Sequence, residues 1–496
     1  MWAMSAAGCR WVGVAGAVGV AAGGWVAGTL PARDPWGIWV PHGPGATVAA
    51  GVVAYLGLTL LVAAWWGYGR AGASVRHTLA TLGWWTAPML LAPPLYSADV
   101  YSYVAQGAMV LEGHDVYGAG PSVLDPAGLG GDAAASVGGN WTDTPAPYGP
   151  VFLILARAVT WVTGGTIVPA VLGMRLIAVA ALALTVWALR RLGRSSPGGE
   201  GGALWLGALN PLLLLHVVGG MHNDGLMIAL MLAGVVLARR GGRGDWVLGS
   251  VLVGLAMMVK SPAAVALLFI GVIAGRAASG RPLAHRVVKG LLGPGVVAGA
   301  VAVGATLLAG TGFGWLRTQS VAGSIHTALS VTSDLGLALG ELAHLVLSTD
   351  PDPVKAAVQR LGLAAALALI AHLAWRCAHG RLDPVHALGL ALAALVALSP
   401  MVQPWYLLWG VVTVAAATGA RDGRAVRVLA VLSAALVYET APSGSTPAYG
   451  FALAAVVCVA GVLLLRREAS AAGEPGRVPG PRTAEWTAAP ESGRLR

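Results

Sequence analysis

The residue best placed to do chemistry is Asp99, in the stretch SADVYSY that begins at Ser97. An apolar run over 78–95 stops just before it, so this carboxylate is expected at the mouth of a membrane helix. The loop from there to Tyr148 holds further acidic residues but no Lys or Arg, which is typical of a loop on the side away from the cytoplasm. The pattern predicts an outer-face active-site loop with Asp99 as its reacting group, able to accept a proton from a substrate hydroxyl. Alternatively, Ser97 or Asp99 only caps a helix that begins near Val100.

A second polar stretch, GGMHND, joins two apolar runs on the same side of the membrane. It places His222, Asn223 and Asp224 at the membrane depth expected for Asp99. Polar and ionisable groups at such a depth are energetically expensive and therefore indicate function. Three of them beside a Gly-Gly pair exceed what a helix cap needs, although capping by Asn223 or Asp224 is the alternative.

Two cations at membrane depth are candidates for neutralising a phosphate. Lys260 lies between two short predicted spans, at their outer ends. Its charge can bind a phosphate there, or the side chain can simply extend to the lipid headgroups. Arg175 lies inside the predicted span 166–190 and therefore needs a partner or a polar cavity.

An outer-face turn, SPMVQPWYLLW, brings a third group of candidates. It combines Gln403, Trp405 and Tyr406. Aromatic rings at this position could stack on a sugar, whereas an interfacial aromatic belt is the alternative explanation.

The composition indicates an integral membrane protein that must position these residues on helices. Hydrophobic residues make up 56% of the chain and charged residues only 10%, with a mean hydropathy of +0.72. The net charge of +10 does not point to nucleic acid, because the bases lie in short loops between apolar runs and so indicate topology. The three cysteines show neither paired nor metal-ligand spacing, which predicts no disulfide and no zinc site.

Apolar runs between charge clusters and Gly/Pro breaks predict an all-α bundle of roughly twelve to fourteen transmembrane helices. The Arg-rich loops then lie inside, with both termini in the cytoplasm, provided that 147–164 lies along the outer surface without crossing. The first run could be a signal peptide, but a retained span is preferred because another span follows closely. The predicted spans are 11–30, 46–66, 76–95, 166–190, 203–219, 222–238, 245–259, 262–275, 289–311, 355–376, 385–400, 404–419, 425–441 and 447–465.

The remaining segments are assigned by composition. A single catalytic domain is expected over 1–467, with outer-face loops at 97–165 and 312–354, the second containing interfacial helices. The tail 468–496 is predicted to be a disordered cytoplasmic segment. The sequence contains neither the dinucleotide-binding glycine motif nor the phosphate-binding P-loop, which argues against a nucleotide-driven pump.

Five stretches, in order along the chain, resemble one family: SADVYSYVAQGAMVLEGHDVY, DTPAPYGPVF, GGMHNDGLM, VKSPA and SPMVQPWYLLWG. They are similar to the MptB-type polyprenol-phosphomannose-dependent α-1,6-mannosyltransferases of actinobacteria, within the GT-C glycosyltransferase superfamily. In that superfamily an Asp in the first long outer loop is the catalytic base, and Asp99 matches its position. Residues that the resemblance and the patterns above associate with donor or acceptor binding are Tyr101, Arg175, His222, Asn223, Asp224, Lys260, Gln403, Trp405 and Tyr406.

The resemblance implies an inverting transfer of mannose from a polyprenyl-phosphate-mannose donor to a lipid-anchored mannan. Such a transfer needs a base for the acceptor hydroxyl, which Asp99 can supply. It also needs positive charge at the departing phosphate, which Lys260 with Arg175 or Arg317 can supply. No cofactor is expected, although a divalent cation is not excluded. The expected location is the plasma membrane, among membrane lipids, with the site on the extracytoplasmic face and no nucleic-acid partner.

Two other classes compete with the transferase. A transporter or flippase of a lipid-linked sugar would show internal repeats and ionisable residues near the midplane. The ionisable residues cluster toward one face instead, which favours the enzyme. A non-catalytic cell-wall scaffold predicts no effect of losing Asp99.

Overall fold

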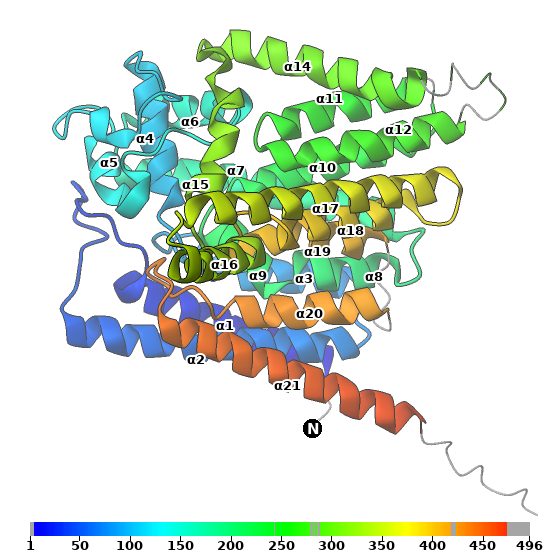
Figure 1. The fold of residues 1–496 in the computed structure, drawn as a ribbon. Helices are drawn as coiled ribbons and strands as arrows, with labels where there is room; N and C mark the ends of the chain where they lie inside the picture. The colour runs from blue at the N-terminus through cyan, green and yellow to red at the C-terminus, as the bar shows by residue number, and fades with distance from the viewer. Residues whose placement is uncertain are drawn as a thin grey trace, which may run out of the picture.

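The computed structural model describes residues 4–242, 244–277, 280, 282, 285, 288–417 and 423–473. Across these ranges the chain forms helices and no strand, which confirms the predicted all-α architecture (Figure 1). The helices are α1 (Ala6–Ala27), α2 (Pro44–Arg70), α3 (Val75–Thr86), α4 (Asp99–Leu111), α5 (Gly131–Val137), α6 (Pro150–Thr163), α7 (Ile167–Gly193), α8 (Gly199–Ala203), α9 (Pro211–Leu213), α10 (Asp224–Ala238), α11 (Asp245–Met257), α12 (Val265–Ala277), α14 (Gly293–Ala309), α15 (Val321–Ser324), α16 (Val331–Leu347), α17 (Asp352–Ala378), α18 (Pro384–Ala397), α19 (Leu407–Ala417), α20 (Arg424–Leu436) and α21 (Ala448–Gly473).

Short 3₁₀ and π turns connect or extend these helices. The 3₁₀ turns are Ala87–Met89, Pro121–Val123, Gly139–Trp141, Ser261–Ala264, Gly312–Leu316, Thr318–Ser320 and Pro404–Tyr406. The π turns are Leu204–Ala208, Leu214–Gly219 and Val288–Leu292.

Six helices among the described residues are long and apolar enough to cross a membrane, so the chain is a multi-pass membrane protein. They are α1, α2, α7, α17, the helix Val288–Ala309 that ends in α14, and the part of α21 up to Arg467. A seventh span results if Gly199–Ala208 and Pro211–Gly219 count as one helix bent by 47°. The count expected from the sequence is higher because it includes shorter apolar helices of 10–17 residues, such as α10, α11 and α18.

Two predicted spans are interrupted in the structure, each beside a proline: one before Pro93 and Pro94, the other before Pro211. The span predicted over 76–95 is helical only as far as Met89, and the chain then runs without helix through Pro93 and Pro94 to the start of α4. The span predicted over 203–219 bends at Asn210, whose side chain caps the next turn by accepting the N–H of Leu212 at 3.0 Å. The first break leaves an extended backbone segment that reaches the polar cluster described below.

Further differences concern the ends of the chain's last helices. The span predicted over 425–441 is shorter, because α20 ends at Leu436. The helix α21 continues to Gly473, past the predicted start of the tail, and the rest of that tail lies outside the described residues.

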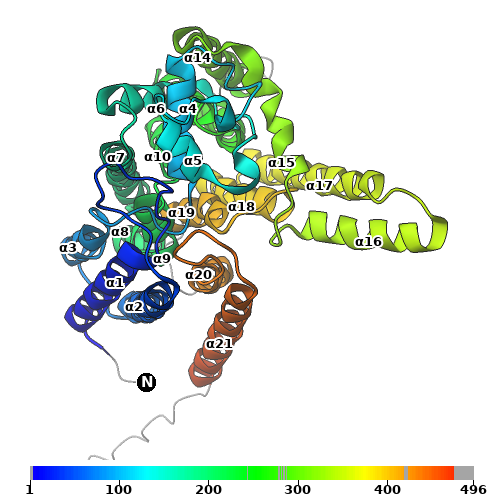
Figure 2. The same cartoon turned by 90° about the vertical axis from the view of Figure 1, so that its left-hand side faces the viewer.

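The helix α16 lies across the long helices. It is seen end-on in Figure 1 and along its length in Figure 2, where it forms a hairpin with α17 that projects from the bundle. Leu335, Leu339, Leu342 and Leu345 on α16 are all exposed. A helix with such an exposed apolar side is of the kind predicted for 312–354, and its placement in the membrane interface stays a prediction.

The two ends of the bundle differ in chemistry. The acidic loop region with α4 and α5 lies on the left in Figure 1, whereas α12 and α17 end on the right. The helix α10 connects the two ends, since it begins at Asp224 and is followed by Arg239 and Arg240. Fifteen residues of α-helix span roughly 22 Å, so these acidic and basic positions are far apart.

Candidate active site

Two backbone segments that are distant in sequence meet directly at the site. The N–H of Leu95 donates to the carbonyl of Gly219 at 3.1 Å, which joins the segment before Asp99 to the GGMHND stretch. Each segment contains a non-glycine residue with positive φ: 64° at Tyr96 and 53° at Met221. Such conformations are uncommon outside glycine and collect at functional sites.

Asp99 is the first residue of α4, and its carboxylate points into a cluster of donors. Its Oδ2 accepts hydrogen bonds from His222 Nδ1 at 3.1 Å and from the Tyr103 hydroxyl at 3.4 Å. The Asp99 N–H donates to Ser97 Oγ at 3.1 Å, so the first N–H group of α4 has a side-chain acceptor in Ser97. The Asp99 carboxylate itself does not cap the helix. Its Oδ1 makes no hydrogen bond to any residue the structure describes, and the side chain is 25% exposed. One carboxylate oxygen is therefore oriented and the other is open to a substrate.

The electrostatics of the cluster keep Asp99 ionised. Burial by itself would raise the pKa of Asp99, but His222 and the more distant Lys260 outweigh it and hold the pKa below its ordinary value. Burial raises the pKa of Tyr103 well above that of a free tyrosine, so its hydroxyl remains a donor. An ionised carboxylate at neutral pH is what a general base requires.

A second acid–base pair lies beside the first. Lys260 Nζ donates to both oxygens of Asp224, at 2.9 and 2.8 Å, and Trp409 Nε1 donates to Asp224 Oδ1 at 2.6 Å. The carboxylate is buried, with 1% of the side chain exposed, whereas Lys260 is 14% exposed. Burial by itself would lower the pKa of Lys260, but the negative charge of Asp224 outweighs it, and the pKa is raised above its ordinary value. Two of the three ammonium N–H groups point at Asp224, while the partial exposure of Lys260 keeps its charge accessible.

Aromatic rings enclose both pairs. The Trp405 ring stacks on His222 with centroids 3.7 Å apart, and Tyr406 stacks on Trp409 at 4.5 Å. Lys260 Nζ lies 4.3 Å from the centroid of the Tyr406 ring, a cation–π contact. Trp405 is buried, which argues against the interfacial-belt explanation for this residue.

Several buried polar atoms at this cluster have no partner within the described chain. They are His222 Nε2, both amide atoms of Asn223, Trp405 Nε1 and both ring nitrogens of His216. An unsatisfied buried polar group costs about 1–3 kcal/mol, so several together need an explanation. Polar ligand groups such as hydroxyls would satisfy them.

For two of the predicted binding residues, the structure records no side-chain contact with the cluster. The Tyr101 hydroxyl donates to the carbonyl of Thr29 at 2.6 Å, which ties α4 to the end of α1 rather than to the site. Side chains four apart share a helix face, so Tyr103 accompanies Asp99 and Tyr101 does not. Gln403 is partly buried and makes no side-chain hydrogen bond to the described residues, so its binding role stays a prediction.

Arg175 is buried and holds backbone rather than a ligand. Its guanidinium donates to the carbonyls of Leu90 at 3.0 Å, Ala92 at 2.7 Å, Pro93 at 3.4 Å and Val218 at 3.3 Å. These carbonyls belong to the two segments that precede Asp99 and His222. The phosphate role expected for Arg175 is therefore replaced by a positioning role, and the helix break at the prolines creates the unpaired carbonyls that it satisfies.

We expect Arg175→Met to lower both the melting temperature in detergent and the turnover number. It leaves up to four buried carbonyls without a donor, which would cost roughly 3 kcal/mol or more in unfolding free energy. Arg175→Lys should recover only part of the loss, because an ammonium lacks the planar fork of donors.

Arg157→Met is the matched control, because Arg157 is an arginine on α6 with one long bond, 3.5 Å to the carbonyl of Ala309. Normal stability of Arg175→Met with a raised KM for the donor alone would contradict the positioning role and restore the phosphate role.

The segment at 312–320 covers the Lys260 side of the site. Ser261 Oγ donates to Gln319 Oε1 at 2.5 Å, and Gln319 Nε2 donates to the carbonyl of Trp315 at 2.9 Å. Arg317 in this segment is exposed and forms no ion pair with any described residue. Over the described ranges, no group of three His, Cys, Asp or Glu side chains is arranged to hold a metal ion.

The sequence patterns missed Tyr103, Tyr148 and Trp409 as members of the cluster. Tyr103 packs edge-on against Tyr148, with ring centroids 5.3 Å apart. The spacing of Tyr103 from Asp99 was a usable signal, because i and i+4 positions share a helix face. No local pattern pairs Trp409 with Asp224, since the bond joins α19 to α10.

Comparison with known proteins identifies the family. The family model "α-(1→6)-mannopyranosyltransferase, N-terminal domain" matches residues 10–276. A second model, the MptB C-terminal domain, matches residues 332–467. No solved structure gives a significant match.

Curated relatives agree along most of the chain. The α-(1→6)-mannopyranosyltransferase A of Mycobacterium tuberculosis is 33% identical, with 89% of this chain and 86% of that protein covered. The α-(1→6)-mannopyranosyltransferase B of Corynebacterium glutamicum is 32% identical, with 82% of this chain and 72% of that protein covered. The range matched by the first family model, residues 10–276, contains both acid–base pairs, Asp99 with His222 and Lys260 with Asp224. The chain belongs to the α-(1→6)-mannopyranosyltransferase family.

Proposed function

We propose that this chain transfers mannose from polyprenyl-phosphate-mannose to a lipid-anchored mannan acceptor and forms an α-1,6 linkage. The reaction is an inverting single displacement on the outer face of the plasma membrane, within lipomannan and lipoglycan synthesis. The observation that carries the proposal is the Asp99 carboxylate, which is held on one oxygen by His222 and Tyr103 and open on the other. The names of the relatives support the mannosyl group and the linkage.

Asp99 and Lys260 have complementary roles in this reaction. As the acceptor oxygen bonds to the anomeric carbon of mannose, its proton moves to Asp99 Oδ1. The bond from that carbon to the phosphate oxygen breaks, and the polyprenyl phosphate leaves with the electron pair. Lys260 stabilises the charge that grows on the phosphate, and Asp224 holds the ammonium in place.

The unpaired polar atoms beside Asp99 supply a binding site for sugar hydroxyls. The amide of Asn223 offers both a donor and an acceptor, and it can hold two neighbouring hydroxyls. His222 Nε2 and Trp405 Nε1 add two further contacts on the same side. A sugar in this position lies next to the open oxygen of Asp99.

The lipid parts of the donor and acceptor fit a membrane-embedded site. Nucleotide sugars are made in the cytoplasm, so a site on the outer face favours a sugar carried on a lipid. The exposed leucines of α16 offer an apolar surface near this end of the bundle.

The proposal is tested with purified protein, polyprenyl-phosphate-mannose and a short α-mannoside acceptor. We expect an acceptor longer by one mannose, with an α-1,6 linkage by NMR, and no product from GDP-mannose. Product from GDP-mannose would contradict the proposed donor. A product with a different linkage would contradict the proposed α-1,6 linkage.

The orientation of the site can be tested by cysteine labelling. Ala127 is exposed in the acidic loop, so Ala127→Cys should react with a membrane-impermeant maleimide in intact cells. Ser195→Cys, on an exposed position in an Arg-rich turn, should react only after lysis. The exchange Cys458→Ser removes the native cysteine that is not buried. The opposite labelling pattern would place the site on the cytoplasmic side.

A further inference from the structure

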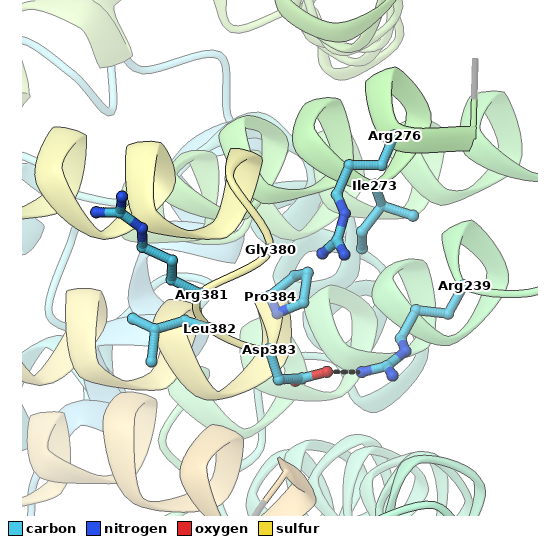
Figure 3. Close-up of a pocket in the computed structure, with 8 residues that line it drawn as sticks. All are labelled: Arg239, Ile273, Arg276, Gly380, Arg381, Leu382, Asp383 and Pro384. Carbon is cyan, nitrogen blue, oxygen red and sulfur yellow. Dashed lines mark hydrogen bonds and ion pairs between the residues drawn. The ribbon is translucent and has the colours of Figure 1, made fainter. Parts of the chain in front are cut away.

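A basic cavity lies at the end of the bundle opposite Asp99. Its volume is about 490 Å³, and it is lined by the ends of α10, α12 and α17 and the start of α18 (Figure 3). Arg239, Arg276 and Arg381 line it together with one acid, Asp383. The three arginines come from different elements, so the fold and not a local sequence run gathers them.

The single acid of the cavity is already engaged. Asp383 Oδ2 accepts from Arg239 Nη1 at 2.9 Å, the dashed contact in Figure 3. Its Oδ1 accepts the N–H groups of Val385 and His386, at 2.9 and 3.2 Å, and so caps α18. With three positive groups and one negative group, the lining has a net charge of +2.

The other two arginines keep their donors available. Arg276 has no ion pair with any residue in the described ranges, and its guanidinium points toward the cavity in Figure 3. Gly380, with φ of 75°, faces it, and a Cβ there would lie 3.7 Å from Arg276 Nη2. Arg381 lies over the Trp375 ring at 5.0 Å, a contact that restrains the side chain. Its guanidinium has no ion pair among the described residues, and it points away from Arg276 in Figure 3.

We propose that this cavity, which Arg276 and Arg381 both line, binds a phosphate-bearing ligand at a site separate from the mannosyl-transfer site. Guanidinium groups match the geometry of phosphate oxygens and can bind them in pairs. The volume is within the usual range of roughly 300–1,000 Å³ for small-molecule sites. The ligand is not the sugar donor, because α10 separates the cavity from Asp224 by its whole length. The same chemistry describes a phospholipid headgroup and a free phosphate.

Two probes distinguish these sources in the full-length protein. Inorganic pyrophosphate is titrated against protein in a neutral detergent, with binding measured by calorimetry. Phosphatidylglycerol is offered in nanodiscs against phosphatidylcholine alone, and retained lipid is counted by native mass spectrometry. The variants are Arg276→Gln and Arg381→Gln, with Arg240→Gln as the matched control, since Arg240 is an exposed arginine beside Arg239 that does not line the cavity.

We expect each cavity variant to weaken binding of at least one probe by about tenfold or more, because each removes a charge-assisted contact. Arg240→Gln should bind as the wild type does. If the cavity variants lose binding of pyrophosphate alone, the site is assigned to free phosphate. If they lose binding of phosphatidylglycerol alone, it is assigned to a lipid headgroup. The proposal is overturned if the wild type binds neither probe, or if both cavity variants bind them as tightly as Arg240→Gln.

Discussion

Replacing Asp99 by Asn is expected to lower the turnover number by about 100-fold or more while the protein still folds and binds the donor. The Asn side chain has nearly the same shape, and its oxygen can still accept from His222 and Tyr103. What it loses is the capacity to take the proton of the acceptor hydroxyl. The measurement is the rate of mannosyl transfer by purified protein at saturating donor and acceptor.

Two further variants sharpen this test. Asp143→Asn is the matched control, because Asp143 is an exposed acid of the same loop without a side-chain hydrogen bond to described residues, and it should keep normal activity. Asp99→Glu should retain little activity, because the longer side chain displaces the carboxylate. A well-folded Asp99→Asn protein with at least half the wild-type rate would reject Asp99 as the base.

Membrane depth was the sequence signal that found the core of the site. Asp99, His222, Asp224 and Lys260 all stand where apolar runs end on one side, and the structure brings them into two hydrogen-bonded pairs. The pairing itself could not be predicted, because each bond joins elements that are far apart in sequence. The same limit explains Trp409, which was assigned to a span and in fact contacts Asp224.

Backbone geometry accounts for most of what the sequence did not reveal. Hydropathy treats 76–95 as one continuous helix, whereas Pro93 and Pro94 end it and leave carbonyls that Arg175 satisfies. Hydropathy of this run therefore predicted neither the extended segment that leads to Asp99 nor the backbone carbonyls that explain an arginine within a membrane helix. Positive φ at Tyr96 and Met221 has no sequence signature at all, since neither residue type favours it.

Lys260→Met is expected to lower the turnover number by roughly 10²- to 10³-fold, the usual effect of removing one group that stabilises transition-state charge. It also leaves the Asp224 carboxylate buried, with the Trp409 N–H as its one remaining partner among the described residues. An unpaired buried charge costs about 3–5 kcal/mol, so this single variant is expected to be unstable as well. Activity of the single variant alone therefore cannot separate a phosphate role from a structural one.

The double variant Lys260→Met/Asp224→Asn separates them. It removes both charges, and the Asn oxygen can still accept from Trp409, so the melting temperature should return toward the wild-type value. If Lys260 stabilises the departing phosphate, turnover stays at least about 100-fold low although the fold has recovered. If the pair is only structural, turnover recovers together with the melting temperature. Measuring both quantities for the wild type, the two single variants and the double variant completes the cycle, and recovery of at least half the wild-type rate would remove Lys260 from the reaction.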